Sequence, residues 1–374
     1  MLRYALLLAP SANRVYADAA SRLARAELAV FAGSGVLDVP PVDAAVERIG
    51  GVEYLTFAAP QPGLGGRDLA YLANLSAAYA LFERVGDDLL RPVPLHPLAR
   101  YDADLITIPK YAGKTNEQFT RLLLNVTVLA SAAAGGMLDR QLVVLDPLCG
   151  RGTTLNQALM YGYDGIGVEH DGKDVDAYAA FLRTWLRRKR LKHTAETVPV
   201  RRDRKLVARR FEAVLAPSRD DHRAGATQRV TVLHTDTTRV REVLRPGCAD
   251  VIVTDAPYGV AHGSRTGQAL SRSPLDLLGA AVPVWRQLLR PGGALGLSWN
   301  TLVAPRAAAE AVLTEAGLRV MDGPGWRDLA HRVDQAIDRD VLVAVAPGDD
   351  SNPADGHHSA SAPPGAAPDR VQPA

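Results

Sequence analysis

The pattern of apolar and polar residues divides the chain into two parts. The first part has an apolar run near Tyr4–Leu8, an Ala-rich amphipathic stretch from Ala12 to Phe31 and a second strand pattern, VEYLTF. After a turn segment rich in Gly and Pro, a second helical pattern covers Asp68 to Val85. This order of strand, helix, strands and helix predicts a small α+β domain over residues 1–95.

From about residue 101, short β-branched or Leu-rich runs alternate with helical patterns. The runs are LVVLDP, GIGVEH, VTVLHTD, ADVIVTDAP, ALGLSWN and LRVMDG. This alternation predicts an α/β fold, a doubly wound, Rossmann-like parallel sheet, over residues 111–347. The Pro-rich segment from Arg91 to Arg100 is the best linker candidate, and we place the linker at 96–110. The closing segment HRVDQAIDRDVLVAVAP predicts a hairpin at a sheet edge.

Composition excludes several classes of protein. The chain has 374 residues, a net charge of +2, 47% hydrophobic and 22% charged residues, as in ordinary globular proteins. Two cysteines exclude a disulfide scaffold and suggest a reducing compartment, and no Cys/His spacing suggests a metal site. No apolar run nears the roughly 20 residues of a membrane span, so we expect a cytoplasmic protein. Residues 348–374 are rich in Pro, Ala, Gly and Ser and predict a disordered tail.

The segment Asp146–Thr154, DPLCGRGTT, carries the strongest motif. It follows the apolar strand LVVL and opens an apolar helix. Gly150 and Gly152 let the backbone turn tightly and approach a ligand, and the helix N-terminus offers free N–H groups. The loop lacks the Gly-Lys-Ser/Thr of a P-loop, and it lacks the G-x-G-x-x-G of nicotinamide-binding proteins.

Acidic residues end the next two strands of the predicted sheet. Glu169 ends GIGVE, about twenty residues along the chain from the glycine loop. At this spacing, a carboxylate at the end of the second strand can bind the two ribose hydroxyls of a nucleotide-like ligand. Asp236 ends VTVLHTD at the same edge, near the expected position of an adenine ring. For Glu169, an ordinary carboxylate at a strand end is the alternative.

The fourth strand ends in Asp255-Ala256-Pro257-Tyr258-Gly259. Asp255 and the Ala256 carbonyl can both accept hydrogen bonds from an exocyclic amino group, which directs the nitrogen lone pair toward an electrophile. Tyr258 can stack on a flipped base. The alternative is a strand-ending turn in which Tyr258 only fills space.

Together these segments resemble the S-adenosylmethionine-dependent methyltransferases that act on amino nitrogens, over Tyr101 to Pro347. Asp146–Thr154 is similar to their D-P-F-x-G-S-G-T motif, and Asp255–Tyr258 to their D/N-P-P-Y/F motif. Ala256 replaces the first proline, which keeps the carbonyl but loses rigidity. The resemblance implies transfer to a nucleobase nitrogen without a metal, by Asp255, Ala256, Pro257 and Tyr258. It implies that S-adenosyl-L-methionine is bound by Asp146, Pro147, Cys149, Gly150, Gly152, Thr153, Glu169, Asp236 and Asp255.

An upstream segment narrows the resemblance. Lys110–Glu117, KYAGKTNE, is similar to the K/R-Y-x-G-x-T segment of THUMP-associated tRNA guanine-N2 methyltransferases. The resemblance implies that Thr115 borders the methionine end of the cofactor; the alternative is a helix N-cap. Residues 1–95 resemble the ferredoxin-like, RNA-docking part of those enzymes but are too few for a full THUMP module. Some relatives need a small zinc-binding partner, so an activator subunit stays possible.

The implied substrate is therefore guanine N2, most specifically in tRNA, with rRNA as a neighbouring case. Two alternatives stay open: a DNA adenine-N6 or cytosine-N4 methyltransferase, and a catalytically inactive RNA-binding protein that senses the cofactor. A basic excursion at about 183–229 bears on this choice. Its run from Arg183 to Arg210 holds 12 Lys and Arg residues. The run predicts either an RNA contact or a solvated helical face.

Overall fold

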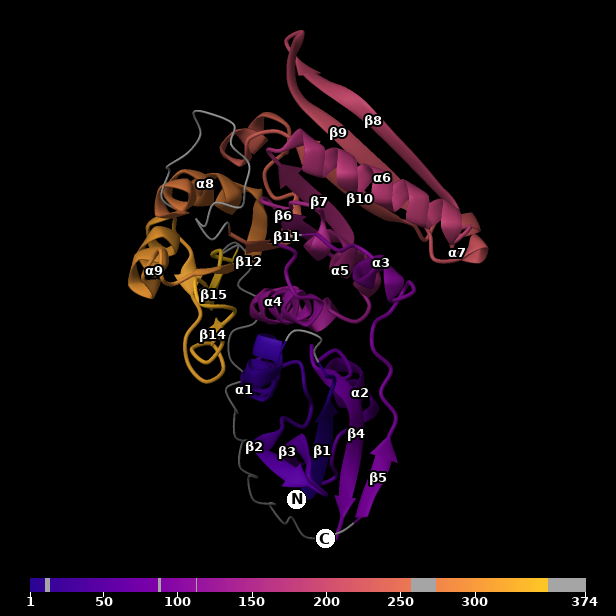
Figure 1. The fold of residues 1–374 in the computed structure, drawn as a ribbon, viewed down its shortest axis with the longest axis vertical. Helices are drawn as coiled ribbons and strands as arrows, with labels where there is room; N and C mark the ends of the chain where they lie inside the picture. The colour runs from indigo at the N-terminus through magenta and orange to yellow at the C-terminus, as the bar shows by residue number, and fades with distance from the viewer. Residues whose placement is uncertain (11–13, 87–88, 112, 257–273, 349–374) are drawn as a thin grey trace, which may run out of the picture.

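The first part of the chain forms a five-stranded antiparallel sheet. The computed structural model describes residues 1–374 except 11–13, 87–88, 112, 257–273 and 349–374. The strand order is β2-β3-β1-β4-β5, and two helices connect the strands on the side facing the rest of the molecule (Figure 1). The elements are β1 (Leu2–Leu8), α1 (Arg14–Gly33), β2 (Val42–Ile49), β3 (Val52–Ala59), α2 (Gly66–Leu72), β4 (Ala78–Val85) and β5 (Leu89–Val93). This is the βαββαβ order of a ferredoxin-like fold with one strand added.

The expected helix from Asp68 to Val85 is wrong in its second half. Helix α2 ends at Leu72, and β4 pairs with β1 in its place. Ala and Leu favour a helix when considered locally, but pairing between strands outweighs that preference here. The polar residues between α2 and β4 are held by distant partners: the Asn74 Oδ1 accepts from the Leu98 amide at 2.9 Å. Strand β5 and the short α3 (Asp104–Thr107) also occupy parts of the predicted linker segments.

The second part forms a larger, mostly parallel sheet. Its strand order is β13-β15-β12-β11-β6-β7-β10-β9-β8, and β14 pairs only with β15. The central strands β10, β7, β6, β11 and β12 are parallel, and the chain winds outward in both directions from β6. The predicted fold class, a Rossmann-like doubly wound methyltransferase sheet with a small N-terminal α+β domain, is therefore confirmed. The strands are β6 (Val143–Asp146), β7 (Asp164–Glu169), β8 (His193–Arg202), β9 (Lys205–Leu215), β10 (Gln228–His234), β11 (Ala249–Asp255), β12 (Leu289–Asn300), β13 (Arg319–Val320), β14 (His331–Arg332) and β15 (Asp338–Val345).

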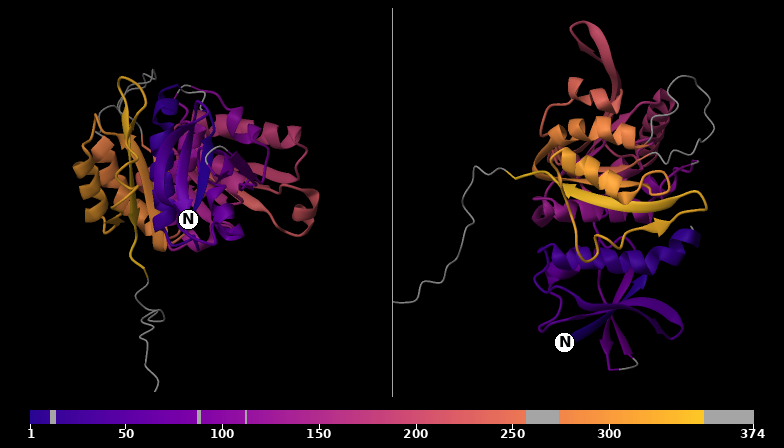
Figure 2. Two further views of the ribbon diagram at one scale, coloured as in Figure 1. Left: turned by 90° about the horizontal axis from the view of Figure 1, so that it is seen from below. Right: turned by 90° about the vertical axis from the view of Figure 1, so that its left-hand side faces the viewer.

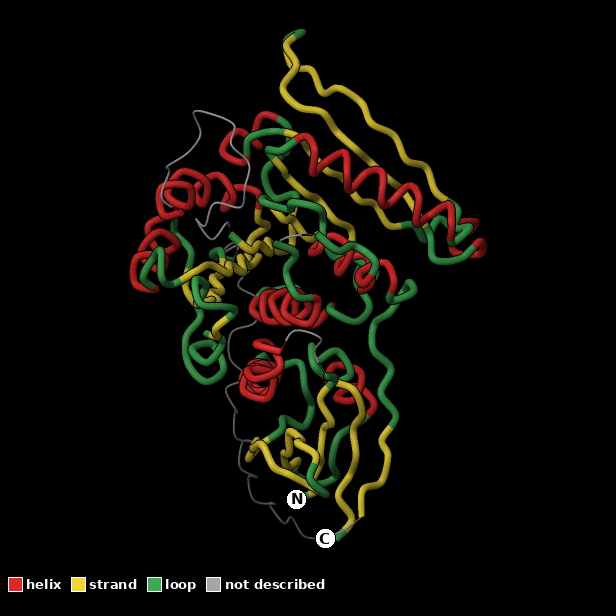
Figure 3. Tube along the Cα trace, in the orientation of Figure 1, coloured by secondary structure: helices red, strands yellow, loops and turns green. Residues whose placement is uncertain are grey.

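Helices cover both faces of this sheet (Figure 3). One hydrophobic cluster packs α4, α5 and α6 on one face, and it continues into the N-terminal part. A second cluster packs α8, α9 and η2 on the other face. The helices are α4 (Glu117–Ala130), η1 (Ala134–Gly136), α5 (Thr153–Tyr161), α6 (Gly172–Arg188), α7 (Arg219–Arg223), η2 (Thr237–Glu242), α8 (Pro274–Leu288) and α9 (Arg306–Glu315).

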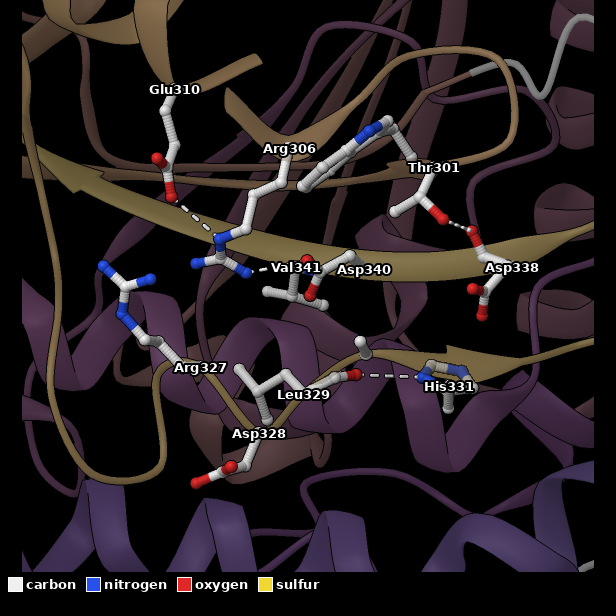
Figure 4. A network of polar contacts seen from close by, with 12 residues as sticks. Thr301, Arg306, Glu310, Arg327, Asp328, Leu329, His331, Asp338, Asp340 and Val341 are labelled. Atoms are coloured by element: carbon white, nitrogen blue, oxygen red, sulfur yellow. Dashed lines mark hydrogen bonds and ion pairs between the residues drawn. The ribbon is translucent and has the colours of Figure 1, made fainter. Parts of the chain in front are cut away.

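Two edge expectations need correction. The closing hairpin forms from β14 and β15, but β15 lies inside the sheet because the short β13 takes the edge. Figure 4 shows how Arg306 of α9 holds β15. Arg306 donates to Asp340 of β15 at 2.7 Å and to Glu310 of its own helix at 2.8 Å. The basic excursion contains the end of α6 but consists mainly of the β8–β9 hairpin, which extends the sheet beyond β10. Most of this segment is therefore a β-hairpin and not a solvated helical face.

Helix α4 joins the two parts of the molecule. The sequence pattern suggested an amphipathic helix, but ten of its 14 residues are buried because α1 covers the side turned away from the large sheet. Gly296 of β12 lets α4 approach closely, since a Cβ there would lie 1.8 Å from the Thr127 Oγ1. At the α1 contact, the buried Glu27 accepts from Asn125 at 2.7 Å and from the Ser76 hydroxyl at 2.6 Å. Burial raises the pKa of Glu27.

Among the described residues, no helix is long and apolar enough to pass through a lipid bilayer.

We expect Glu27→Ala to lower the free energy of unfolding by about 1–3 kcal/mol, because the Ser76 and Asn125 donors would stay buried without their acceptor. Chemical denaturation of the full chain measures this effect. Arg25→Ala, on the exposed side of the same helix, is the matched control and should change stability by less than about 0.5 kcal/mol. Equal effects of the two variants would show that the buried network does not hold the two parts together.

Candidate functional site

The predicted site residues of three strands meet at one edge of the large sheet. Asp146 ends β6, Glu169 ends β7 and Asp255 ends β11. Because these strands are parallel neighbours, their carboxyl ends lie at the same edge. In doubly wound sheets this edge, where the chain changes direction, is the place where ligands bind.

The glycine loop between β6 and α5 requires its two glycines. Gly150 and Gly152 have φ angles of 48° and 78°, in the left-handed region that favours glycine. A Cβ on Gly152 would lie 2.4 Å from the ring of Tyr178, so the loop packs against α6 without room for a side chain. The Cys149 amide donates to the Val168 carbonyl at 3.0 Å, which fastens the loop to β7. Gly152 is the residue that precedes the N-terminus of α5.

The first residues of this loop are buried. The Asp146 Oδ1 accepts from the Thr254 hydroxyl at 2.9 Å and from the Leu148 amide at 3.1 Å. Burial raises the pKa of Asp146 to about 7. Pro147 and Cys149 are buried as well, and burial raises the pKa of the Cys149 thiol well above its usual value. A thiol held neutral in this way is a poor nucleophile, which supports a packing role for Cys149.

Glu169 and Asp236 lie near each other but have different partners. The Glu169 carboxylate accepts from the Gly150 amide at 2.9 Å and from the Asp171 amide at 2.7 Å. Burial raises the pKa of Glu169, although these two bonds favour its charged form. The Asp236 Oδ1 accepts from the amide and the hydroxyl of Thr238 at 2.8 and 2.7 Å, and so caps η2. The Asp236 side chain thus has a structural task in addition to any ligand contact.

The segment Lys110–Glu117 reaches the site at two points. The Tyr111 hydroxyl shares a hydrogen bond of 2.8 Å with the Thr153 hydroxyl, at the start of α5. The Thr115 hydroxyl donates to the Asp255 Oδ2 at 2.7 Å. The alternative role of Thr115, as the N-cap of α4, is wrong: the cap is Asn116, whose side chain accepts from the Phe119 amide.

Asp255 is held by three side chains from different elements. Besides Thr115, the Ser298 hydroxyl donates to its Oδ1 at 2.6 Å, and the Arg339 guanidinium lies 3.4 Å from its Oδ2. The Asp255 side chain retains 16% exposure, so one side of the carboxylate still faces solvent. The buried Ala256 follows, with its amide donating to the Ser298 carbonyl at 2.8 Å. Pro257 and Tyr258 lie outside the described residues.

Sequence reasoning missed Ser298 and Arg339. Ser298 lies on β12 directly beside Asp255, so the rule that polar residues gather at strand ends offered a signal. Arg339 offered none, because β15 is antiparallel and its first residues reach this edge only through the fold. Its guanidinium lies 4.3 Å over the Phe119 ring. Burial lowers the pKa of the neighbouring His331 to about 4, so this imidazole adds no positive charge at neutral pH.

Comparison with known proteins agrees with this geometry. The family model of the UPF0020 (RMKL-like) methyltransferase domain matches residues 130–280, which span the glycine loop and Asp255. Residues 130–280 form a methyltransferase domain. No curated protein matches the sequence.

Several solved structures align loosely with the chain. TrmN from Thermus thermophilus is 13% identical, with 92% of this chain and 100% of that chain covered and a TM-score of 0.41. The 16S rRNA N2 G1207 methyltransferase RsmC from the same organism is 19% identical, with 81% and 58% covered and a TM-score of 0.35. The magnesium protoporphyrin IX methyltransferase ChlM from Synechocystis is 14% identical, with 63% and 86% covered and a TM-score of 0.36.

A methyltransferase domain implies S-adenosyl-L-methionine as its cofactor, and the residues at this edge fit that molecule. At Gly150 a Cβ would meet no atom within 4 Å, so on that side the main chain of the loop borders open space. Glu169 offers carboxylate lone pairs suited to ribose hydroxyls. Carboxylates along the edge, Glu169 and Asp236 among them, suit a ligand that carries positive charge on sulfur and on its amino group.

We expect Glu169→Ala to weaken the binding of S-adenosylhomocysteine by about 1–3 kcal/mol, because a charged hydrogen-bond acceptor for the ribose is lost. Isothermal titration calorimetry measures the affinity, and urea unfolding separates this effect from loosening of the glycine loop. Glu196→Ala, on the exposed strand β8, is the control and should leave the affinity unchanged. An unchanged affinity in Glu169→Ala would contradict the ribose assignment.

Proposed function

We propose that the protein transfers a methyl group from S-adenosyl-L-methionine to an exocyclic amino nitrogen of a nucleobase in RNA, most specifically guanine N2 in tRNA. The observation that carries this proposal is the position of Asp255. Its carboxylate ends β11 at the edge that also carries the glycine loop, and Thr115 and Ser298 fix both of its oxygens. A carboxylate oriented in this way, together with the Ala256 carbonyl that follows it, is suited to accept hydrogen bonds from the two N–H groups of an aromatic amine.

Asp255 and the residues around it have different roles in methyl transfer. S-adenosyl-L-methionine, when bound, supplies a methyl group activated by a positively charged sulfur. Thr115 and Ser298 orient the Asp255 carboxylate before the substrate arrives, so that little reorganisation is needed during reaction. Asp255 then orients the amino group, stabilises the positive charge that develops on its nitrogen and can accept the proton that the nitrogen loses. Arg339 also holds this carboxylate in place, with its guanidinium 3.4 Å from the Asp255 Oδ2.

The finer parts of the proposal have separate support. The two contacts of segment 110–117, Tyr111 with Thr153 and Thr115 with Asp255, agree with its resemblance to the THUMP-associated guanine-N2 enzymes. We assign stacking on the target base to Tyr258. We assign RNA docking in part to residues 1–95, which the contact of α1 with α4 fixes relative to the site.

Methyl transfer from radiolabelled S-adenosyl-L-methionine onto bulk tRNA, ribosomal RNA and duplex DNA tests the function. We expect label in tRNA, and mass spectrometry of the digested RNA should find N2-methylguanosine. Label in DNA alone would favour the DNA amino-methyltransferase. No label anywhere, despite measured cofactor binding, would favour the inactive cofactor sensor.

We expect Asp255→Asn and Asp255→Ala to lower the rate of transfer at least about 100-fold, because the oriented carboxylate at the acceptor is lost. Cofactor affinity, measured by calorimetry, should stay within a few fold of that of the unchanged protein. Glu315→Gln, an exposed position on α9, serves as the control. A parallel loss of cofactor affinity in both Asp255 variants would show that this residue acts on the cofactor rather than on the acceptor.

A further inference from the structure

The β8–β9 hairpin continues well past the edge of the large sheet. Strand β10 pairs with β9 only from Leu215 to Arg209. Within residues 205–208, Lys205, Leu206 and Ala208 pair with β8 alone, and the ladder is irregular at Val207. At a rise of about 3.3 Å per residue, these four residues carry the hairpin roughly 13 Å beyond His234, the last residue of β10. Figures 1 and 2 show its end standing clear of the rest of the molecule. We call residues 201–206 the hairpin tip.

The hairpin tip projects from the same edge as the candidate site. His234 pairs with Glu169 on one side and with Arg209 on the other, so β9 lies two strands from the predicted ribose contact. Strand β9 lies four strands from β11, which at about 4.8 Å per strand places it roughly 19 Å from the strand of Asp255. The hairpin tip therefore flanks the site on its cofactor side.

The positive charge of the excursion divides into three groups. One group, Arg187, Arg188, Arg190 and Lys192, is exposed at and just after the end of α6, at the sheet edge away from the candidate site. Several basic residues near the hairpin's body bind this chain itself: Lys189 pairs with Asp104 at 2.7 Å, Arg209 with Asp176 at 2.9 Å, and Arg183 lies over the Phe211 ring. The hairpin tip holds four more, all exposed: Arg201, Arg202, Arg204 and Lys205. Within the described part of the chain, no ion pair joins these four to a carboxylate.

Two further features distinguish the hairpin tip from an edge strand whose charges only keep the protein soluble. Charges that protect an edge strand should be spread along it, but residues 194–200 of β8 carry only Glu196 as a charged residue. The turn itself puts Asp203 and Arg204 at φ angles of 48° and 66°, where Asn and Gly are the usual residues. A long charged side chain is thus retained at a conformationally costly position, at the farthest point of the hairpin.

We infer that the hairpin tip binds the phosphate backbone of the RNA substrate while a base of the same RNA occupies the site near Asp255. This inference rests on the proposed function and adds the element that recognises the polymer. The lateral distance of roughly 19 Å and the overhang of roughly 13 Å combine to a span of about 23 Å, which corresponds to about seven stacked nucleotides at 3.4 Å each, so a free nucleoside does not reach both places. The hairpin tip acts on the affinity for RNA and leaves cofactor binding unaffected.

The test compares the full chain with a variant that carries Arg201→Gln, Arg202→Gln, Arg204→Gln and Lys205→Gln. The control removes four exposed charges at the opposite edge of the sheet: Lys192→Gln, Arg219→Gln, Arg245→Gln and Arg319→Gln. Fluorescence anisotropy with bulk tRNA, ribosomal RNA and duplex DNA, at several salt concentrations, gives the affinity and its salt dependence. Circular dichroism and S-adenosylhomocysteine affinity check that both variants fold.

We expect the tip variant to lose at least tenfold in affinity for RNA, and the slope of log affinity against log salt to fall by about 3, because up to four phosphate contacts are lost. The control should bind RNA within twofold of the unchanged protein. Equal RNA affinity of the tip variant and the unchanged protein would overturn the inference, as would a loss confined to duplex DNA or an unchanged protein that binds no RNA. Binding does not depend on methyl transfer. A protein that binds RNA through the hairpin tip but transfers no methyl group would contradict only the proposed function.

Discussion

The burial of helix α4 between two sheets is the constraint on which the rest of the structure depends. Its apolar side chains fill the face of the large sheet near β11, β12 and β15, while α1 covers the opposite side. Since the helix is buried nearly all round, its position along its own axis is fixed by packing. That position brings Thr115, two residues before its first turn, to Asp255. The N-terminal part thus contributes to the geometry of the site through the contact of α1 with α4.

The site combines fixed backbone with oriented carboxylates. Left-handed glycines shape the loop, while Glu169 binds the loop amide of Gly150 and keeps lone pairs for a ligand. Asp255 lies two strands from Glu169 on the same edge, between two hydroxyl donors and the buried Arg339. Because these partners are in place in the free protein, the carboxylates need little reorganisation when a charged ligand binds. This arrangement suits a reaction in which alignment of the reactants and electrostatic stabilisation provide most of the rate enhancement.

The sequence predicted best what depends on local pattern and on parallel strands. The glycine loop, the strand-end acids and the doubly wound sheet follow from apolar runs that end in special residues, and such runs need no knowledge of distant partners. It failed where distant pairing decides: residues 78–85 form β4 because β1 and β5 flank them. Arg339 was missed for the same reason, since only the antiparallel insertion of β15 brings it to Asp255. The run from Arg183 to Arg210 could be recognised as basic from the sequence. Its pattern did not reveal that the β8–β9 hairpin places some of these basic residues beyond the edge of the sheet.

A crystal structure of the full chain with S-adenosylhomocysteine tests the central claim most directly. The account predicts that the ligand lies along the carboxyl edge, with its ribose hydroxyls within hydrogen-bond distance of Glu169 and its sulfur turned toward the side of Asp255. A ligand bound elsewhere on the molecule, or one whose ribose lies away from Glu169, would contradict it.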